Sequence, residues 1–399
     1  MANRALLRPG YKPRLLTLSG NEITDAVRRL NTQGDGVSPS DFSIGIWAAA
    51  TNLVTNGGFE TNTTGWTTGG TNTIARSTEQ AKFGAASLKC TYSNNANLAD
   101  FGITLTNAAH SASVWVYIPT AYDGGGIELR QLNFTVAASA IAANMALLDQ
   151  WQRIELPNFT PGIDVTGDIQ VNNTGVAPTA GRFIYVDGHQ TELQPLCTPY
   201  VETDGGTAAR SASVVSLSSS LLDIDQCWWA ARLRPGWVGG TMDVRIASWR
   251  DAGNGIEMFF EAAGDTVSMV ANAAYASDTA GIAYGGGYGA GVDHTVVGYV
   301  SRTSLGVSLD GSAFTIASRT RNSEPAATTF AIGDLQEGGG QLFDGDLLGF
   351  ATGRGFLTNA DAYAIHYLLT NQRMSLKPHH LPGDCTGYWL PGSGVFLAR

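Results

Sequence analysis

The chain has 399 residues, a formal net charge of −10, 15% charged residues and 43% hydrophobic residues. This composition excludes wholesale disorder, because there is enough apolar surface to form real cores. The acidic balance argues against a non-specific nucleic-acid binder, which needs a basic stripe. At about 150 residues per domain the length predicts two to three domains. The 49 glycines favour β-structure with many turns.

Residues 1–50 differ from the rest because they hold a quarter of all lysines and arginines. One short helix is predicted over 21–30, where Ile23, Val27 and Leu30 form an apolar stripe. We expect an arm with one docking helix that anchors the protein to a partner surface. The alternative is a strand and a helix folded onto the protein's own body. The candidate anchoring residues are Arg4, Arg8, Arg14, Arg28 and Arg29.

We expect neither export nor membrane insertion. No apolar segment follows the basic residues of the first 14 positions, so a signal peptide is not predicted. The longest mostly apolar stretch, 136–148, is interrupted by polar residues and is too short to span a bilayer.

From residue 51 onward, short β-rich runs alternate with glycine, asparagine or proline turns, which is typical of an antiparallel sandwich. Along one of these runs Val114, Val116 and Ile118 share a face, and Trp115 and Tyr117 share the other. The predicted strands lie at 87–92, 112–118, 127–136, 151–156, 168–172 and 182–190.

The start and the end of this region resemble carbohydrate-binding-module-like jelly rolls. The opening resembles theirs in the sequences NLVTNGGFE at 52–60, GW at 65–66 and FGAASL at 83–88. The run FIYVDGHQTEL at 183–193 resembles their closing strand. The resemblance implies a jelly roll over residues 51–202.

The segment after this strand is similar to sequences in virion proteins of tailed bacteriophages. It reads TPYVET at 198–203 and AARSA at 208–212. In those proteins a comparable text often follows a module of this kind. The resemblance implies a linker at 203–212 and a virion context.

The jelly-roll resemblance also implies ligand sites. Members of the family often bind a structural calcium where Glu60 and Asp187 stand, and oxygen-rich clusters suit this ion. The alternative is a solvated carboxylate and a polar residue at a strand end. No other cofactor is expected. Sugar-binding modules also stack exposed aromatic rings on pyranose faces, and the candidates here are Trp66, Trp115, Tyr117, Tyr122 and Trp151. The alternative for each ring is core packing.

A second β-rich region follows, with predicted hairpins at 263–265 and at Asp310-Gly311. A helix is predicted over 357–369, capped by Thr358 or Asn359. This order resembles a concanavalin-A-like (laminin-G-like) sandwich over residues 213–370, followed by an extended tail at 371–399. The candidate glycan-binding residues in it are Trp249, Tyr284 and Tyr288, and one of Trp228 and Trp229 is expected to point outward or into an interface.

The search for catalytic residues favours a protein that is not an enzyme. Glu257 and Glu261 share a strand face but lie about 13 Å apart at a rise of ~3.3 Å per residue. A retaining glycosidase needs carboxylates about 5–5.5 Å apart. No G-x-S-x-G or H-E-x-x-H motif occurs. Cys90, Cys197, Cys227 and Cys385 fit no zinc spacing and are expected to be buried or free thiols.

Together these features predict an all-β protein with two tandem antiparallel β-sandwiches and an N-terminal arm. The predicted function is a non-enzymatic virion protein of a tailed bacteriophage, either a capsid decoration or head fibre or a tail-associated protein, assembled in the host cytoplasm. Its partners would be a major capsid or tail protein, further copies of itself, most simply in a trimer, and glycans. The alternatives are a receptor-binding adsorption protein and a polysaccharide depolymerase.

Overall fold

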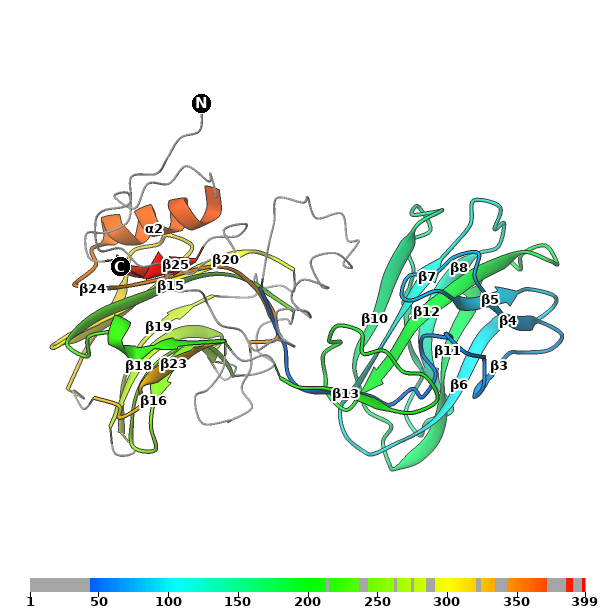
Figure 1. Cartoon of the computed structure of the whole chain (residues 1–399), viewed down its shortest axis with the longest axis horizontal. Helices are drawn as coiled ribbons and strands as arrows, with labels where there is room; N and C mark the ends of the chain where they lie inside the picture. The colour runs from blue at the N-terminus through cyan, green and yellow to red at the C-terminus, as the bar shows by residue number, and fades with distance from the viewer. Residues whose placement is uncertain are drawn as a thin grey trace. The chain divides into compact units, whose positions relative to one another are not determined.

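The chain folds into two units that consist almost entirely of antiparallel strands (Figure 1). One unit is Ala49–Ala212, here the N-terminal sandwich; the other combines Met1–Ala48 with Ser213–Arg399, here the C-terminal sandwich. The predicted all-β class with two sandwiches is confirmed. The computed structural model describes residues 44–212, 215–236, 243–261, 264–273, 276–284, 291–320, 324–333, 343–371, 385–389 and 397–398.

The N-terminal sandwich packs two five-stranded sheets around one apolar core. Val114, Val116 and Ile118 are fully buried in that core, which confirms the predicted alternation. Sheet I has the order β10 (Trp151–Phe159), β7 (His110–Tyr117), β12 (Phe183–Glu192), β5 (Ser87–Thr91), β4 (Thr73–Ser77). Sheet II has the order β3 (Trp66–Thr67), β6 (Asn97–Leu105), β11 (Val165–Thr174), β8 (Gly126–Leu132), β9 (Ser139–Ala142).

The chain enters and leaves the N-terminal sandwich on two strands that pair with each other, β2 (Ala50–Asn52) and β13 (Ala208–Arg210). Part of the segment expected as a linker is therefore a strand. The buried Asn52 fixes this junction, because its Nδ2 donates to the carbonyls of His189, at 3.0 Å, and Val201, at 2.9 Å. Its Oδ1 accepts the N–H of Val54. The asparagine that opens the jelly-roll motif thus ties the entry strand to the closing strand.

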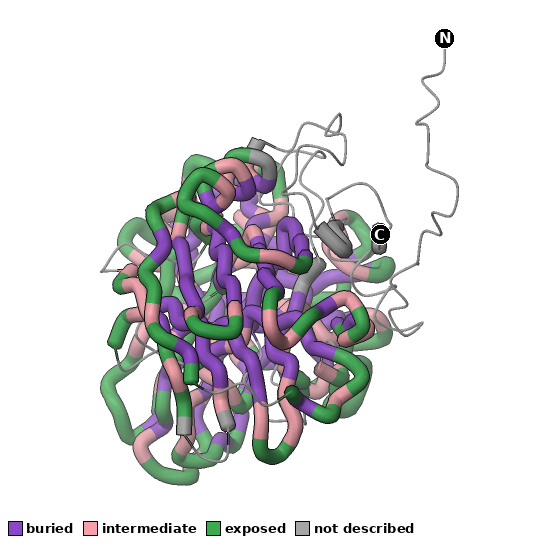
Figure 2. Tube along the Cα trace, turned by 90° about the vertical axis from the view of Figure 1, so that its left-hand side faces the viewer, coloured by how far each residue is buried: buried purple, intermediate pink, exposed green. Residues whose placement is uncertain are grey.

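The C-terminal sandwich consists of an eight-stranded and a six-stranded sheet. Seven strands of the eight-stranded sheet III have the order β22 (Thr315–Ser318), β21 (Ser304–Leu309), β20 (His294–Ser301), β15 (Gln226–Pro235), β24 (Gly345–Arg354), β25 (Cys385–Trp389), β26 (Leu397–Ala398), and the eighth strand pairs with β24 outside this order. The six-stranded sheet IV has the order β14 (Val215–Ser218), β23 (Thr329–Ile332), β16 (Val244–Arg250), β17 (Asn254–Glu261), β18 (Thr266–Ala273), β19 (Ala276–Ala283). In the C-terminal sandwich the buried residues run along the strands, while exposed ones gather in the loops (Figure 2).

Two segments that were expected outside the sandwiches, in the N-terminal arm and in the C-terminal tail, contain strands of sheet III. β1 (Ile44–Ile46), expected within the arm, pairs with β24 and so belongs to sheet III. This is the alternative of a strand folded onto the protein's own body. In the expected tail, β25 pairs with β24 and extends the same sheet. The arm helix predicted at 21–30 lies outside the described residues.

Helix α2 (Asn359–Asn371) confirms the predicted helix and covers sheet III beside β15 and β20 (Figure 1). The predicted inward stripe, formed by Ala362, Ile365 and Leu369, is buried. Thr358 and Asp361 form a reciprocal cap, since each backbone N–H donates to the other's side-chain oxygen, at 2.7 and 3.3 Å. In the part of the chain that the structure describes, no helix combines the length and apolarity required to cross a bilayer.

Neither Trp228 nor Trp229 points outward to solvent, because both are fully buried, and Trp228 instead lies in the interface between sheet III and α2. They do lie on opposite faces of β15, as the alternation requires. Trp229 stacks on Phe330 between the sheets, with ring centroids 5.9 Å apart. Trp228 packs in the cluster beneath α2, together with Tyr299 and Leu357. The helix buries a sheet face that would otherwise be exposed.

Candidate functional sites

A row of aromatic side chains crosses the outer face of sheet I and lies outside the hydrophobic core. Trp151 on β10 stands opposite Tyr117 on β7, and Tyr117 stands opposite Tyr185 on β12. Phe183 extends the row along β12. Successive ring centroids are 5.7, 5.9 and 5.5 Å apart, with edge-to-face angles. Tyr185 is buried and the other three rings are half-buried, so the row presents apolar ring surface to solvent.

One end of this aromatic row carries an ion pair. The Nζ of Lys89 lies 4.1 Å from the centroid of Phe183 and 2.8 Å from Oε2 of Glu79. The hydroxyl of Tyr185 donates to the same carboxylate. The hydrogen bond from Lys89, and then that from Tyr185, hold the pKa of Glu79 below its ordinary value. Glu79 is therefore an ionised and exposed acceptor next to the rings.

Three predicted stacking residues of this unit are buried, so their assignment as exposed platforms is wrong. Trp66 lies in the core against Phe59 and Phe101, and its Nε1 donates to the carbonyl of Asn56 at 2.9 Å. Tyr122 is also in the core, where its hydroxyl accepts from Asn173 at 2.7 Å. Burial raises the pKa of Tyr122 above its ordinary value.

Trp115 shows a different kind of burial, because it stands on the outer face of sheet I but is covered. The ring of Phe83 lies 6.1 Å away, and the Nζ of Lys82 lies 3.8 Å from the Trp115 centroid. Only 5% of Trp115 is exposed. The loop at 82–86 therefore removes this tryptophan from the accessible surface.

The predicted calcium ligands Glu60 and Asp187 hold that same loop. Asp187 Oδ2 accepts the N–H groups of Lys82, at 2.7 Å, and Phe83, at 2.9 Å, and its Oδ1 accepts that of Gly188. Both Glu60 oxygens accept the N–H of Ala85 at 3.0 Å. Burial, with a smaller contribution from the charge on Glu60, raises the pKa of Asp187 to about 7.

These contacts engage all four carboxylate oxygens with backbone N–H donors, although each oxygen has a second lone pair. Among the described residues, no group of three or more His, Cys, Asp and Glu side chains could hold a metal ion. Calcium at Glu60 and Asp187 stays a prediction.

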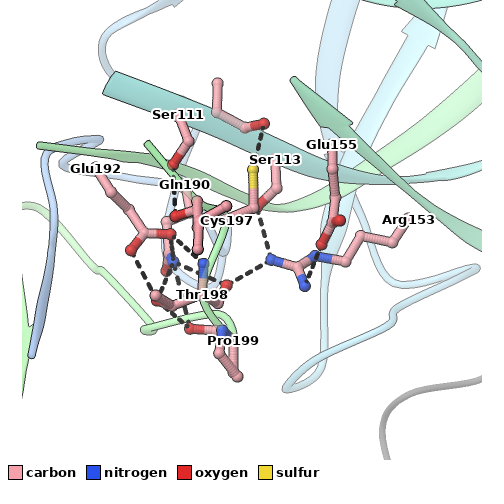
Figure 3. A network of polar contacts seen from close by, with 11 residues as sticks. Ser111, Ser113, Arg153, Glu155, Gln190, Glu192, Cys197, Thr198 and Pro199 are labelled. Atoms are coloured by element: carbon pink, nitrogen blue, oxygen red, sulfur yellow. Dashed lines mark hydrogen bonds and ion pairs between the residues drawn. The ribbon is translucent and has the colours of Figure 1, made fainter. Parts of the chain in front are cut away.

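The closing segment at 197–201 is fixed to sheet I by a network of polar contacts (Figure 3). The buried Glu192 accepts the backbone N–H of Thr198 at 2.9 Å and its hydroxyl at 2.7 Å. Arg153 donates to Ser113 and to the carbonyl of Thr198, and it pairs with Glu155 at 2.6 Å. The sulfur of Cys197 donates to the carbonyl of Ala112 at 3.2 Å. Thr198, the first residue of the 198–203 sequence, is thus hydrogen-bonded to sheet I and holds the end of this sandwich in place.

The outer face of sheet IV bears a groove of about 410 Å³. Its centre is Glu257, whose side chain is 2% exposed and pairs with Arg245 at 2.6 Å and Arg250 at 2.8 Å. Asn272 Nδ2 donates to the same carboxylate at 3.0 Å. The guanidinium of Arg245 also lies 4.0 Å from the centroid of Phe259. We call this the sheet IV groove.

Sequence reasoning considered Glu257 only as an acid and missed the groove around it. The alternation of arginine and glutamate along β16 and β17 was the available signal. Glu257 is held by two arginines, and Oε2 of Glu261 accepts from Thr266 at 3.0 Å and Ser268 at 3.4 Å. Neither carboxylate shows the geometry of a glycosidase pair.

Of the aromatic residues predicted for sugar contact in the C-terminal sandwich, Trp249 and Tyr284 do not line this groove. Trp249 points into the interior, is 2% exposed and donates its Nε1 proton to the carbonyl of Ala327 at 2.9 Å, so its assignment is wrong. Tyr284 is half-buried, with its ring 6.0 Å from that of Phe260. Tyr288 and the five predicted anchoring arginines lie outside the described residues. Cys90, Cys197 and Cys227 are buried free thiols, as expected.

Comparison with known proteins finds β-sandwiches among solved structures. No family model matches the chain, and no curated protein matches it. The C-terminal family 22 carbohydrate-binding module of Clostridium thermocellum Xyn10B matches at 15% identity and a TM-score of 0.29, over 39% of this chain and 97% of its own. The tandem CBM22-1–CBM22-2 of Paenibacillus barcinonensis Xyn10C matches at 11% and 0.31, over 76% and 98%.

Domains LG4-5 of the mouse laminin alpha1 chain match at 9% identity and a TM-score of 0.28, over 66% of this chain and 88% of theirs. At these identities and TM-scores the similarity does not identify a ligand or a role for this chain. The functional argument therefore depends on the surfaces described above.

Proposed function

We propose that this protein is a non-enzymatic glycan-binding protein and that the aromatic row on sheet I is its binding surface. The observation that carries the proposal is the placement of Trp151, Tyr117 and Phe183 on an outer sheet face, where each ring is only partly buried. Core packing does not require these rings, because the core of this sandwich is filled from the other face of the sheet.

The chemistry of the row fits a sugar. Aromatic faces offer a large, rigid apolar surface, and the C–H groups of a pyranose ring can pack on it. Glu79 and Lys89 at the end of the row supply an acceptor and a donor for hydroxyl groups. An apolar platform with a few fixed polar groups is the general composition of a ligand site.

The test compares single variants of the full-length protein in affinity electrophoresis through a panel of soluble polysaccharides. We expect Trp151→Ala and Tyr117→Ala to weaken the retention of the wild-type protein at least tenfold. Tyr363→Ala is the matched control, because this tyrosine is 62% exposed on α2, in the other sandwich. Equal retention of the row variants and the wild type, or no retention of the wild type, would refute the proposal.

We further propose that the protein is a structural component of a tailed-bacteriophage virion, as a capsid decoration, head fibre or tail-associated subunit. Support comes from the resemblance of the sequences at 198–203 and 208–212 to those of virion proteins. In this proposal the arm arginines attach the chain to a capsid or tail protein, and the protein assembles as a trimer. Antibody-gold labelling of purified virions tests it: label on heads or tails supports the proposal, and unlabelled particles contradict it.

A further inference from the structure

We propose that the sheet IV groove is a second saccharide site, for a short uncharged saccharide, and that it works independently of the aromatic row. This inference extends the proposed glycan-binding class to the C-terminal sandwich. It stands on different residues, so the two proposals can fail separately.

The groove is built across four neighbouring strands. Phe259 on β17 stands opposite Arg245 on β16 and Ser268 on β18. In the next row Val270 lies between Glu257 and Thr279. A half-buried ring and a valine thus form an apolar floor, and polar side chains rise on both sides. The volume of about 410 Å³ lies within the range of about 300–1,000 Å³ that is usual for small-molecule sites.

The polar groups of the groove are fixed before any ligand arrives. Glu257 is too buried to contact a ligand, and its role is to hold Arg245 and Arg250 in position. Its third partner, Asn272, is fixed by the same carboxylate. A donor that is already held in its binding position loses little side-chain entropy when a ligand binds. Its affinity for the ligand is therefore higher than that of a mobile donor making the same contact.

The charges of the groove select a neutral ligand. Two arginines and two glutamates, Glu257 and Glu261, balance one another among the residues that line it. An anionic ligand would meet Glu261, and a cationic one would meet the arginines. Sugar hydroxyls both donate and accept, so they suit a wall with arginine and amide donors on one side. The hydroxyls of Ser277 and Thr279 on β19 provide acceptors on the other.

The experiment uses isothermal titration of the full-length protein with four neutral trisaccharides, namely maltotriose, cellotriose, xylotriose and galactotriose, and with trigalacturonate. We expect at least one neutral trisaccharide to bind the wild type. Phe259→Ala removes the floor and Thr279→Trp fills the groove, so each should weaken this binding at least tenfold. Thr279 is exposed, so its replacement should not disturb folding even where Phe259→Ala does.

Two controls separate the sites. Thr315→Trp introduces the same bulk at an exposed position on β22 and should leave binding unchanged. Trp151→Ala identifies any trisaccharide binding that takes place on the aromatic row instead. The proposal is overturned if no neutral trisaccharide binds at millimolar concentration, or if trigalacturonate binds more tightly. It is also overturned if Trp151→Ala abolishes binding while the groove variants retain it, a result that would support the aromatic row.

Discussion

Sheet I of the N-terminal sandwich and sheet III of the C-terminal sandwich both carry aromatic residues on the outer face, but only one of them has a helix over it. On sheet III, α2 covers Trp228 and Tyr299, so both are fully buried. On sheet I, the loop at 82–86 covers Trp115 and leaves Trp151 and Tyr117 partly exposed. Alternation along a strand therefore specifies the face on which an aromatic residue lies, while its exposure depends on what later parts of the chain place over it.

The largest expected difference between the two sheets is in stability. Trp228→Ala leaves a cavity beneath α2 and should lower the free energy of unfolding of the C-terminal sandwich by about 3–5 kcal/mol. Trp151→Ala removes a half-buried cross-strand contact and should cost the N-terminal sandwich about 1 kcal/mol or less. Calorimetric unfolding of both variants measures the difference. Equal costs would contradict the view that the helix makes one face a core.

A second comparison concerns two glutamates that pair with arginine. Glu257→Gln removes the buried carboxylate that pairs with two arginines. It should lower the free energy of unfolding by about 3–5 kcal/mol, which does not exceed the effect of Trp228→Ala. Glu155 is the control, because 47% of its side chain is exposed and it pairs with a single arginine, Arg153. Glu155→Gln should cost about 0–1 kcal/mol. Chemical denaturation of both variants tests this difference, and similar costs would show that burial does not strengthen the groove's ion pairs.

The pH dependence of stability should differ between the sandwiches because of Asp187. Its pKa is about 7 in the folded state, and an unfolded aspartate titrates near 3.9. Folding therefore takes up a proton between these values, and the N-terminal sandwich should lose about 1–3 kcal/mol of stability as the pH rises from about 5 to 8. Asp187→Asn should flatten this dependence while also weakening the loop at 82–86.

The same measurement in millimolar calcium tests the metal prediction. A bound cation would favour the charged carboxylate and remove the loss of stability at high pH. Thermal unfolding that is identical with calcium and with a chelator would exclude calcium at Glu60 and Asp187.

A modest effect is expected at the cap of the covering helix. Thr358→Ala removes the hydroxyl that accepts from Asp361 and should cost about 0.5–2 kcal/mol. Loss of the cap weakens the first turn of α2, so the backbone amides of α2 should exchange their hydrogens with solvent faster than in the wild type. Unchanged exchange there would indicate that packing alone holds the helix.

Local sequence patterns predicted a large part of the fold. Alternation at 113–118, the Asp310-Gly311 turn between β21 and β22, and the apolar stripe of α2 all correspond to the structure. Each of these depends on neighbours in the sequence. β1 beside β24 was not predicted, because that pairing joins residues about 300 positions apart and a three-residue strand carries almost no periodic signal.

The candidate sites were harder to predict for the same reason. Tyr117 and Trp151 were named as candidates, but their cross-strand contact with Tyr185 depends on register between strands distant in the sequence. The burial of Trp66 and Trp249 depends on the opposing sheet. The spacing of Glu257 to Glu261 does not reveal its environment, which is set by Arg245 and Arg250 on β16 and by Asn272 on β18.

The paired strands β2 and β13 determine how this molecule can be divided. Because the chain passes out of the C-terminal sandwich after β1 and returns to it before β14, the N-terminal sandwich is an insertion within the other unit. A gene cut after residue 212 would therefore give a second fragment that lacks β1, with the edge of β24 unpaired at Leu347. A fragment of residues 49–212 keeps both halves of the β2–β13 ladder, so the sandwich that comes first in the sequence is the one to excise.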